Sequence, residues 1–138
     1  RLYLVYGTNQ DVNRIIPITI KNAIENKKFA CSSGKQLRDF IYVEDVVRAI
    51  IKILKNNTVK GEIINIGSGK PIAIKKVILK ICSLINSGIP QFDKIKFRKD
   101  EILKLYPSIK KAKKLINWKP EVDMTSGLNK CIQYFKKH

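Results

Sequence analysis

Two kinds of apolar pattern alternate along the chain. Short, nearly continuous apolar runs are typical of buried strands in a parallel sheet, and longer segments with apolar residues three or four positions apart are typical of helices. The short runs predict strands at residues 1–6, 29–31, 37–42, 62–66 and 94–98. The longer segments predict helices at residues 14–26, 44–57, 74–85 and 108–117, and a last helix from near residue 123 or 125 to residue 135. This alternation of strands and helices predicts an α/β fold.

Residues near the helix ends support these boundaries. Pro17 falls in the first turn of its helix, where its missing N–H is tolerated, and Ser108 suits an N-cap. Asn117 is the non-glycine residue best able to adopt the left-handed conformation that closes a helix. Glu44 and Asp45 are acids at a helix N-terminus, which the helix dipole favours. The apolar face of that helix consists of Val46, Val47, Ile50, Ile51 and Leu54.

Length and composition are those of one folded domain. The chain has 138 residues, and 44% of them are hydrophobic, which is enough to bury a core. No apolar run approaches the roughly 20 residues that span a bilayer, and no signal peptide is recognisable. The first residue is Arg1 rather than Met and already lies in a predicted strand, so we expect a piece of a longer protein.

The cysteines and the histidine exclude several kinds of site. Cys31, Cys82 and Cys131 are widely spaced without a Cys-x-x-Cys pair, and His138 is the only histidine. Zinc sites need clustered thiolates and imidazoles, so we expect no structural metal. One terminal histidine also leaves no Ser/His/Asp or Cys/His catalytic set. Widely spaced cysteines in odd number are typical of a reducing compartment, which predicts a cytoplasmic protein.

The formal net charge of +17 raises an alternative function, a basic non-enzymatic module that binds nucleic acid or an acidic partner. However, 23 of the 28 basic residues are lysines, spread over the whole chain. No basic strand interleaved with aromatic residues and no helix-turn-helix or RRM-like signature is present. We therefore expect no nucleic-acid partner and keep the basic module as the alternative.

Two motifs invite a catalytic interpretation and do not support it. Residues 67–70 read Gly-Ser-Gly-Lys, but a Walker A loop needs a glycine where Ile64 stands and a hydroxyl where Pro71 stands. The third glycine of a dinucleotide fingerprint is missing too, so we interpret this segment as a strand-to-helix turn. The carboxylate pairs at 44–45 and 100–101 are adjacent in the sequence, with no isolated base or nucleophile nearby. We predict no catalytic residue in this chain.

Polar and guanidinium groups beside turns and strands are the remaining candidates. The chain has only five arginines, and an arginine beside a turn can present a fixed fork of donors to a phosphate. Asn13, Arg14, Arg38 and Arg98 therefore form a candidate anion-binding set. The alternative is that the arginines make ordinary surface ion pairs, with Arg38 pairing with Asp39 or capping a loop.

Six segments in register carry a family resemblance over nearly the full chain. They are Arg1-Leu2-Tyr3-Leu4-Val5-Tyr6-Gly7, Asn13-Arg14-Ile15-Ile16-Pro17, Arg38-Asp39-Phe40-Ile41-Tyr42-Val43-Glu44-Asp45-Val46-Val47, Glu62-Ile63-Ile64-Asn65-Ile66-Gly67-Ser68-Gly69, Arg98-Lys99-Asp100-Glu101 and Lys111-Ala112-Lys113-Lys114-Leu115-Ile116-Asn117-Trp118-Lys119-Pro120. Taken in order, they resemble the C-terminal portion of an NAD(P)-dependent nucleotide-sugar epimerase/dehydratase of the extended short-chain dehydrogenase/reductase family.

This resemblance implies an architecture and a set of ligands. Residues 1–138 would be the C-terminal substrate-binding portion, with the last two parallel strands of a Rossmann-type sheet at 1–6 and 62–66 and a small mixed α/β lobe. The cofactor-binding half, with its glycine-rich turn and Tyr-x-x-x-Lys pair, would precede Arg1. The intact enzyme would use NAD or NADP, act on a nucleoside-diphosphate sugar and form a homodimer, and this portion alone would be inactive.

The resemblance also implies a role for individual residues. Asn13 and Arg14 match the segment that lines the sugar-diphosphate, and Arg38 matches the diphosphate-binding arginine. Phe40 matches the ring beside the nucleotide. The late pair that holds phosphate and ribose is matched by Arg98 and Glu101.

Three departures from the family pattern leave the substrate open. The usual Gly-Pro after the first strand is Gly7-Thr8, residues 31–34 lack an aromatic that often stacks on the base, and Asn117 replaces a glycine. The base and the reaction (4-epimerase, 4,6-dehydratase or ketoreductase) therefore stay open.

Overall fold

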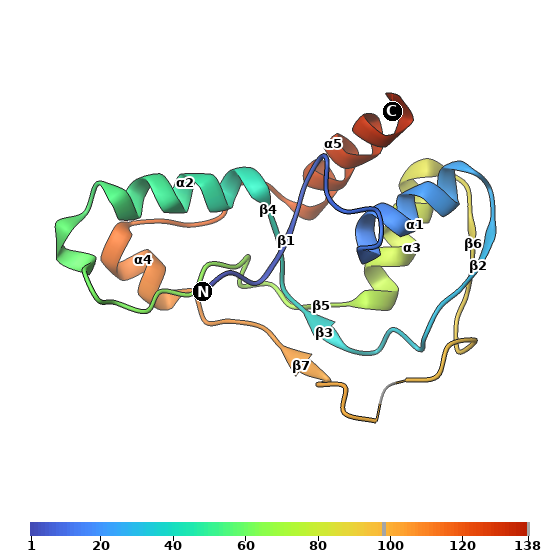
Figure 1. Cartoon of the computed structure of the whole chain (residues 1–138), viewed down its shortest axis with the longest axis horizontal. Coiled ribbons are helices and arrows are strands. Elements are labelled where there is room, and N and C mark those ends of the chain that lie inside the picture. The colour runs from blue at the N-terminus through green and yellow to red at the C-terminus, as the bar shows by residue number, and fades with distance from the viewer. Residues whose placement is uncertain (98, 138) are drawn as a thin grey trace.

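The structure is a computed structural model that describes residues 1–97 and 99–137. Helices lie on both sides of a short parallel strand pair (Figure 1). The elements in chain order are β1 (Leu4–Tyr6), α1 (Ile15–Ile24), β2 (Lys28–Ala30), β3 (Leu37–Arg38), β4 (Phe40–Tyr42), α2 (Val43–Leu54), the 3-10 helix η1 (Asn57–Val59), β5 (Ile72–Ala73), α3 (Ile74–Ile85), β6 (Ile89–Gln91), β7 (Lys104–Leu105), α4 (Lys110–Ile116) and α5 (Met124–Lys137). The α/β alternation predicted from the sequence is present.

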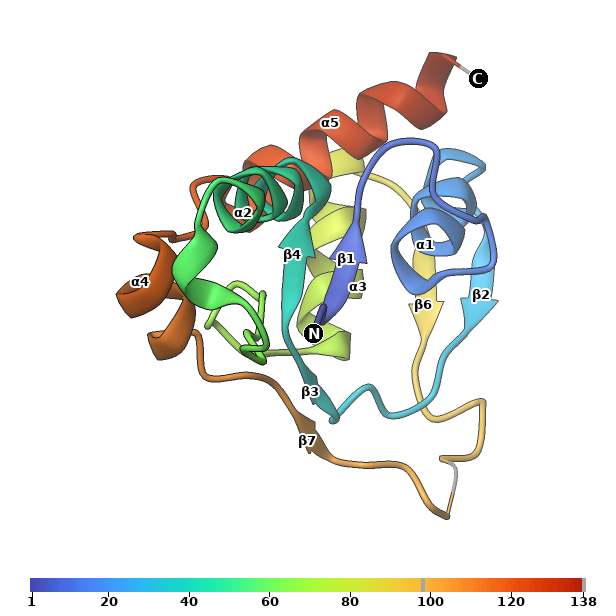
Figure 2. The ribbon, with the colours of Figure 1, turned by 60° about the vertical axis from the view of Figure 1, so that its left-hand side comes forward.

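The central pair is β1 with β4, which run parallel with Leu4 opposite Phe40 (Figure 2). The start of the chain also pairs with residues 64–66, through hydrogen bonds from the amide of Tyr3 to Ile66 O (3.2 Å) and from the amide of Ile66 to Arg1 O (2.8 Å). The strand predicted at 62–66 is therefore reduced to a single parallel bridge between Leu2 and Ile66. The two segments expected to be the last two strands of a parallel sheet therefore lie next to each other at this bridge.

Two smaller sheets complete the lobe. Strand β2 pairs in parallel with β6, while β3 pairs antiparallel with β5 and parallel with β7. The strand predicted at 94–98 is wrong for residues 94–97, which adopt bends and coil, and Arg98 lies outside the described residues. The strands in this region are instead β6, which pairs with β2, and β7, which pairs with β3. They flank the loop that contains residues 94–97. Pro90 lies within the edge strand β6, where a missing N–H is tolerated.

Alternate residues of β1 and β4 feed two separate hydrophobic clusters, as the period of two in a strand requires. Tyr6, Phe40 and Tyr42 pack with buried residues of α1, α3 and α5. Val5 and Ile41 pack on the other face with α2, η1 and α4. The strand pair therefore forms a layer between two groups of helices. The group that contains α1 contacts the candidate site.

The apolar face predicted for α2 is only partly buried. Val46 packs into the second cluster together with Ala49. The remaining members of the predicted face, however, are exposed on the surface of the chain. They are Val47 (48% exposed), Ile50 (44%), Ile51 (46%) and Leu54 (78%). We call these four residues the α2 stripe.

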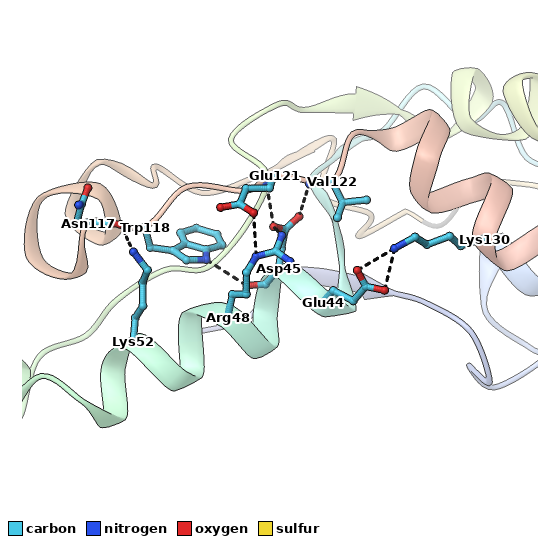
Figure 3. A network of polar contacts seen from close by, with 9 residues as sticks. All are labelled: Glu44, Asp45, Arg48, Lys52, Asn117, Trp118, Glu121, Val122 and Lys130. Atoms are coloured by element: carbon cyan, nitrogen blue, oxygen red, sulfur yellow. Dashed lines mark hydrogen bonds and ion pairs between the residues drawn. The ribbon is translucent and has the colours of Figure 1, made fainter.

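The two acids that begin α2 act in tertiary contacts (Figure 3). The buried carboxylate of Asp45 accepts hydrogen bonds from the backbone amides of Glu121 (2.7 Å) and Val122 (3.0 Å) and pairs with Arg48. Glu44 is exposed and binds Lys130 of α5 (2.8 Å). The helix-dipole interpretation of these acids was therefore incomplete, since both also tie α2 to the C-terminal segment.

Two of the other helix ends agree with the sequence, but the N-cap predicted at Ser108 is wrong, because α4 begins at Lys110 and its N-cap residue is Ile109. Asn117 closes α4 with a φ of 43°, in the left-handed region. Asp123 caps α5 by accepting hydrogen bonds from the amides of Thr125 (2.8 Å) and Ser126 (3.1 Å). None of the helices in the described ranges is long and apolar enough to cross a membrane.

Candidate functional site

A cavity of about 710 Å³ lies beside β1 and the N-terminus of α1. Its floor is β1 with the adjoining Tyr3, and its walls come from the start of α1, from Phe40 and from the loop that follows β6. The described residues that line it are Tyr3, Leu4, Val5, Tyr6, Gln10, Asn13, Arg14, Ile15, Ile16, Ser32, Gln36, Phe40, Ile95, Lys96, Phe97 and Glu101. Four of the six site residues expected from the family resemblance (Asn13, Arg14, Phe40 and Glu101) are on this wall.

Asn13 and Arg14 are positioned by a turn around Asp11. The side chain of Asp11 accepts hydrogen bonds from the backbone amide (2.9 Å) and the side-chain amide (3.1 Å) of Asn13. Arg14 is the exposed N-cap residue of α1, and its own side chain makes no capping hydrogen bond. The first turn of α1 contains no acid. This wall therefore offers a guanidinium beside a helix N-terminus that carries no acid, a combination that favours an anion.

Phe40 is a rigid part of the wall. It is buried and packs edge-to-face on Tyr6, with ring centroids 6.4 Å apart. Burial raises the pKa of Tyr6 well above its ordinary range, so its hydroxyl is neutral. This aromatic pair can contact a planar or apolar part of a ligand.

Arg38 lies behind the cavity wall. It is not among the lining residues, and its buried guanidinium binds Glu101, which does line the cavity. Its Nη1 also donates to the carbonyl oxygens of Leu37 (2.9 Å) and Ile102 (2.7 Å). The alternative that Arg38 pairs with Asp39 is wrong, whereas its other form, that Arg38 caps a loop, agrees with the hydrogen bond to Ile102 O. The structure connects Arg38 to the cavity through Glu101.

The turn at 67–69 does not fit a dinucleotide. Its backbone amides at Ser68 and Gly69 donate to the carboxylate of Asp39 at 2.5 and 2.7 Å. A side chain of this protein therefore fills the position that a pyrophosphate takes in a phosphate-binding turn, and the interpretation as a structural turn is confirmed.

Several cavity residues were missed by the sequence analysis. Gln36 stands two residues before Arg38 in an extended segment. The period of two puts both side chains on one face of that segment, and this could have suggested Gln36 as a site residue. Lys96 and Phe97 lie in a loop and gave no signal that a single sequence could reveal. Arg98, the remaining expected residue, is outside the described ranges. Within those ranges no group of three or more His, Cys, Asp or Glu residues could hold a metal.

The cavity thus brings a guanidinium, an aromatic ring and a carboxylate from separate segments to one place in the fold. Comparison with known proteins gives the relatives of this lobe. Residues 1–67 match the family described as NAD dependent epimerase/dehydratase. The chain is 34% identical over 140 residues to a UDP-glucuronate 4-epimerase of Thermodesulfobacterium geofontis, covering 100% of this chain and 42% of that protein. It is 34% identical over 135 residues to a CDP-abequose synthase of Salmonella muenchen, covering 96% of this chain and 45% of that protein.

A solved structure agrees with these matches. The UDP-glucuronic acid 4-epimerase of Bacillus cereus, in complex with UDP-glucuronic acid and NAD, superposes with a TM-score of 0.90 and 28% identity over 99% of this chain and 44% of that one. The chain spans less than half the length of these relatives. The chain is related to nucleotide-sugar epimerases, dehydratases and decarboxylases, and nearly half of it matches the NAD dependent epimerase/dehydratase family.

Proposed function

We propose that the chain is the C-terminal, substrate-binding portion of an NAD(P)-dependent enzyme that acts on a nucleoside-diphosphate sugar as an epimerase, 4,6-dehydratase or ketoreductase. The observation that supports this proposal most is the cavity of about 710 Å³, which gathers Asn13, Arg14, Phe40 and Glu101 from segments far apart in the sequence. Relatives that match the whole chain carry the names of epimerases and dehydratases of nucleotide sugars.

Each end of the proposed ligand has a matching group in the cavity. Arg14 and the amides at the start of α1 face the diphosphate, where charge-assisted hydrogen bonds are worth roughly 1.5–3 kcal/mol each. Phe40 contacts the nucleotide, and Glu101 accepts hydrogen bonds from ribose hydroxyls. Arg38 and Arg98 complete the diphosphate site. Arg38 does so once the Glu101 carboxylate has moved away from it.

The chemical step belongs to the portion that this chain does not span. In the proposed enzyme that portion supplies NAD or NADP and the general base, and the whole is a cytoplasmic homodimer. Binding energy at the diphosphate, remote from the reacting carbon, holds the sugar in position for hydride transfer. We expect this chain alone to bind the substrate and to catalyse nothing.

Calorimetric titration with nucleoside diphosphates and their sugars tests the proposal. We expect saturable binding to one site, with an affinity that falls about tenfold in Arg14→Gln because one charge-assisted contact is lost. Lys76→Gln is the matched control, because Lys76 is an exposed cation on α3 outside the cavity lining. No saturable binding of any nucleoside diphosphate, or an equal loss in both variants, would refute the proposal.

The basic non-enzymatic module predicts a different result in the same assay. Duplex DNA and heparin would bind in proportion to their charge, with a steep dependence on salt. Arg14→Gln and Lys76→Gln would then weaken binding equally, because each removes one of 28 basic residues.

A further inference from the structure

The guanidinium of Arg38 is held in place independently of any ligand. Nη1 donates to two backbone carbonyls, Leu37 in β3 and Ile102 just before β7. The side chain is only 11% exposed. The orientation of the guanidinium plane is therefore fixed by the backbone of the lobe, and the donors on Nη2 point in one direction.

The partner of Nη2 is the carboxylate of Glu101. This ion pair is largely buried, with Glu101 at 24% side-chain exposure. Glu101 lines the cavity and Arg38 does not, so the glutamate side chain lies between the arginine and the cavity. Among the described lining residues Glu101 is the only acid, in a wall that also carries Arg14 and Lys96.

We propose that Glu101 is a built-in substitute for the ligand's anion. Its carboxylate occupies the Arg38 donors on Nη2, and a diphosphate binds by replacing it there. This inference rests on the proposed function, because it names how the diphosphate reaches an arginine that does not itself line the cavity. Any anion must therefore compete with the Glu101 carboxylate for the Arg38 donors, and a weak or singly charged anion does not displace that carboxylate.

The exchange requires only a side-chain rotation. The carbonyl of Ile102, the residue after Glu101, stays bound to Nη1, so the backbone beside Glu101 remains attached to Arg38 while the carboxylate moves away. The released carboxylate remains on the cavity wall. There it is free to accept hydrogen bonds from ligand hydroxyls, the role proposed for it above.

Inorganic pyrophosphate is the probe that isolates this exchange, because it brings the anion without a ribose or a base. We expect Glu101→Gln to raise the affinity for pyrophosphate about tenfold, since the neutral amide competes less well for Arg38. Glu62→Gln is the matched control, because Glu62 makes an exposed pair with Lys111 (2.5 Å) and its loss changes the net charge equally. We expect this control to change the affinity less than twofold at 0.15 M salt.

Three outcomes would overturn the inference: an unchanged affinity in Glu101→Gln, a lower one, or an equal gain in the control. Should Glu101→Gln fail to fold, Glu101→Asp shortens the carboxylate by one methylene and should give a smaller gain. In the unmodified chain, the Glu101 Cδ resonance should shift with pyrophosphate at the same half-saturation as the calorimetric titration. A resonance that stays unchanged at saturation would also overturn it.

These results separate the inference from the proposed function. If nucleoside-diphosphate sugars bind but Glu101→Gln does not gain affinity for pyrophosphate, the exchange is wrong and the function stands. If pyrophosphate shows the gain and no nucleoside-diphosphate sugar binds, the exchange stands and the function is wrong.

Discussion

Replacing Asp45 by alanine should destabilise the chain far more than replacing its neighbour Glu44. The Asp45 carboxylate is completely buried and accepts the amides of Glu121 and Val122. In Asp45→Ala both amides lose their acceptor in a partly buried place. An unsatisfied buried donor costs about 1–3 kcal/mol, so the expected loss for two donors is about 2–6 kcal/mol, a large part of a domain stability of roughly 5–15 kcal/mol.

Arg48 adds little to this loss. Its side chain is 34% exposed and also lies 3.4 Å from a carboxylate oxygen of Glu121, so it keeps a partner and solvent when Asp45 is removed. Asp45→Asn keeps the shape and one accepting oxygen, which should halve the cost. The comparison of the two variants therefore separates the hydrogen bonds from the packing of the side chain.

Urea unfolding measures this prediction. Trp118 is the only tryptophan, is buried and donates to the backbone carbonyl of Asp45 at 3.1 Å, so its fluorescence reports on this contact, while circular dichroism reports on the helices. Glu44→Ala is the control, since its pair with Lys130 is exposed and screened by solvent. Equal shifts of the midpoint in Asp45→Ala and Glu44→Ala would refute the reasoning, as would a change of slope alone.

Two further predictions concern the first hydrophobic cluster. Gly127→Ala should lower the urea midpoint although alanine favours a helix by about 1 kcal/mol, because the new Cβ would lie 2.2 Å from the hydroxyl oxygen of the buried Tyr6; an unchanged or higher midpoint would contradict this. Burial raises the pKa of Cys131 to about 11, from an ordinary value of 9.0, so this thiol should resist an aromatic disulfide reagent at pH 8 until urea unfolds the chain. Its contribution to stability should be complete below pH 9 and lost as the pH rises through 11, which urea midpoints at pH 8 and 10.5 would show.

The sequence predicted those elements in which local pattern and tertiary packing agree. The helix at 74–85 has an apolar stripe of period 3.6, and α3 occupies the same residues because that stripe faces the core. The apolar residues Ile95 and Phe97 suggested a strand, but they are apolar for a reason other than packing in a core. Their side chains line the cavity, so they are apolar without pairing in a sheet. A single sequence does not distinguish these two causes of an apolar run.

The candidate site was predictable in some of its members and not in its connections. Local context indicated Asn13 and Arg14, the family resemblance added Phe40, and the cavity contains all three. The partner of Arg38 is 63 residues away in the sequence, and no periodicity relates the two positions. The nearer acid, Asp39, points to the 67–69 turn instead.

The α2 stripe has a consequence for how copies of this chain behave in solution. Four large apolar side chains of one helix are open to water, so contact between two such stripes would remove apolar surface from water. A charge introduced at Ile50 would reach water and make copies of the chain less prone to associate.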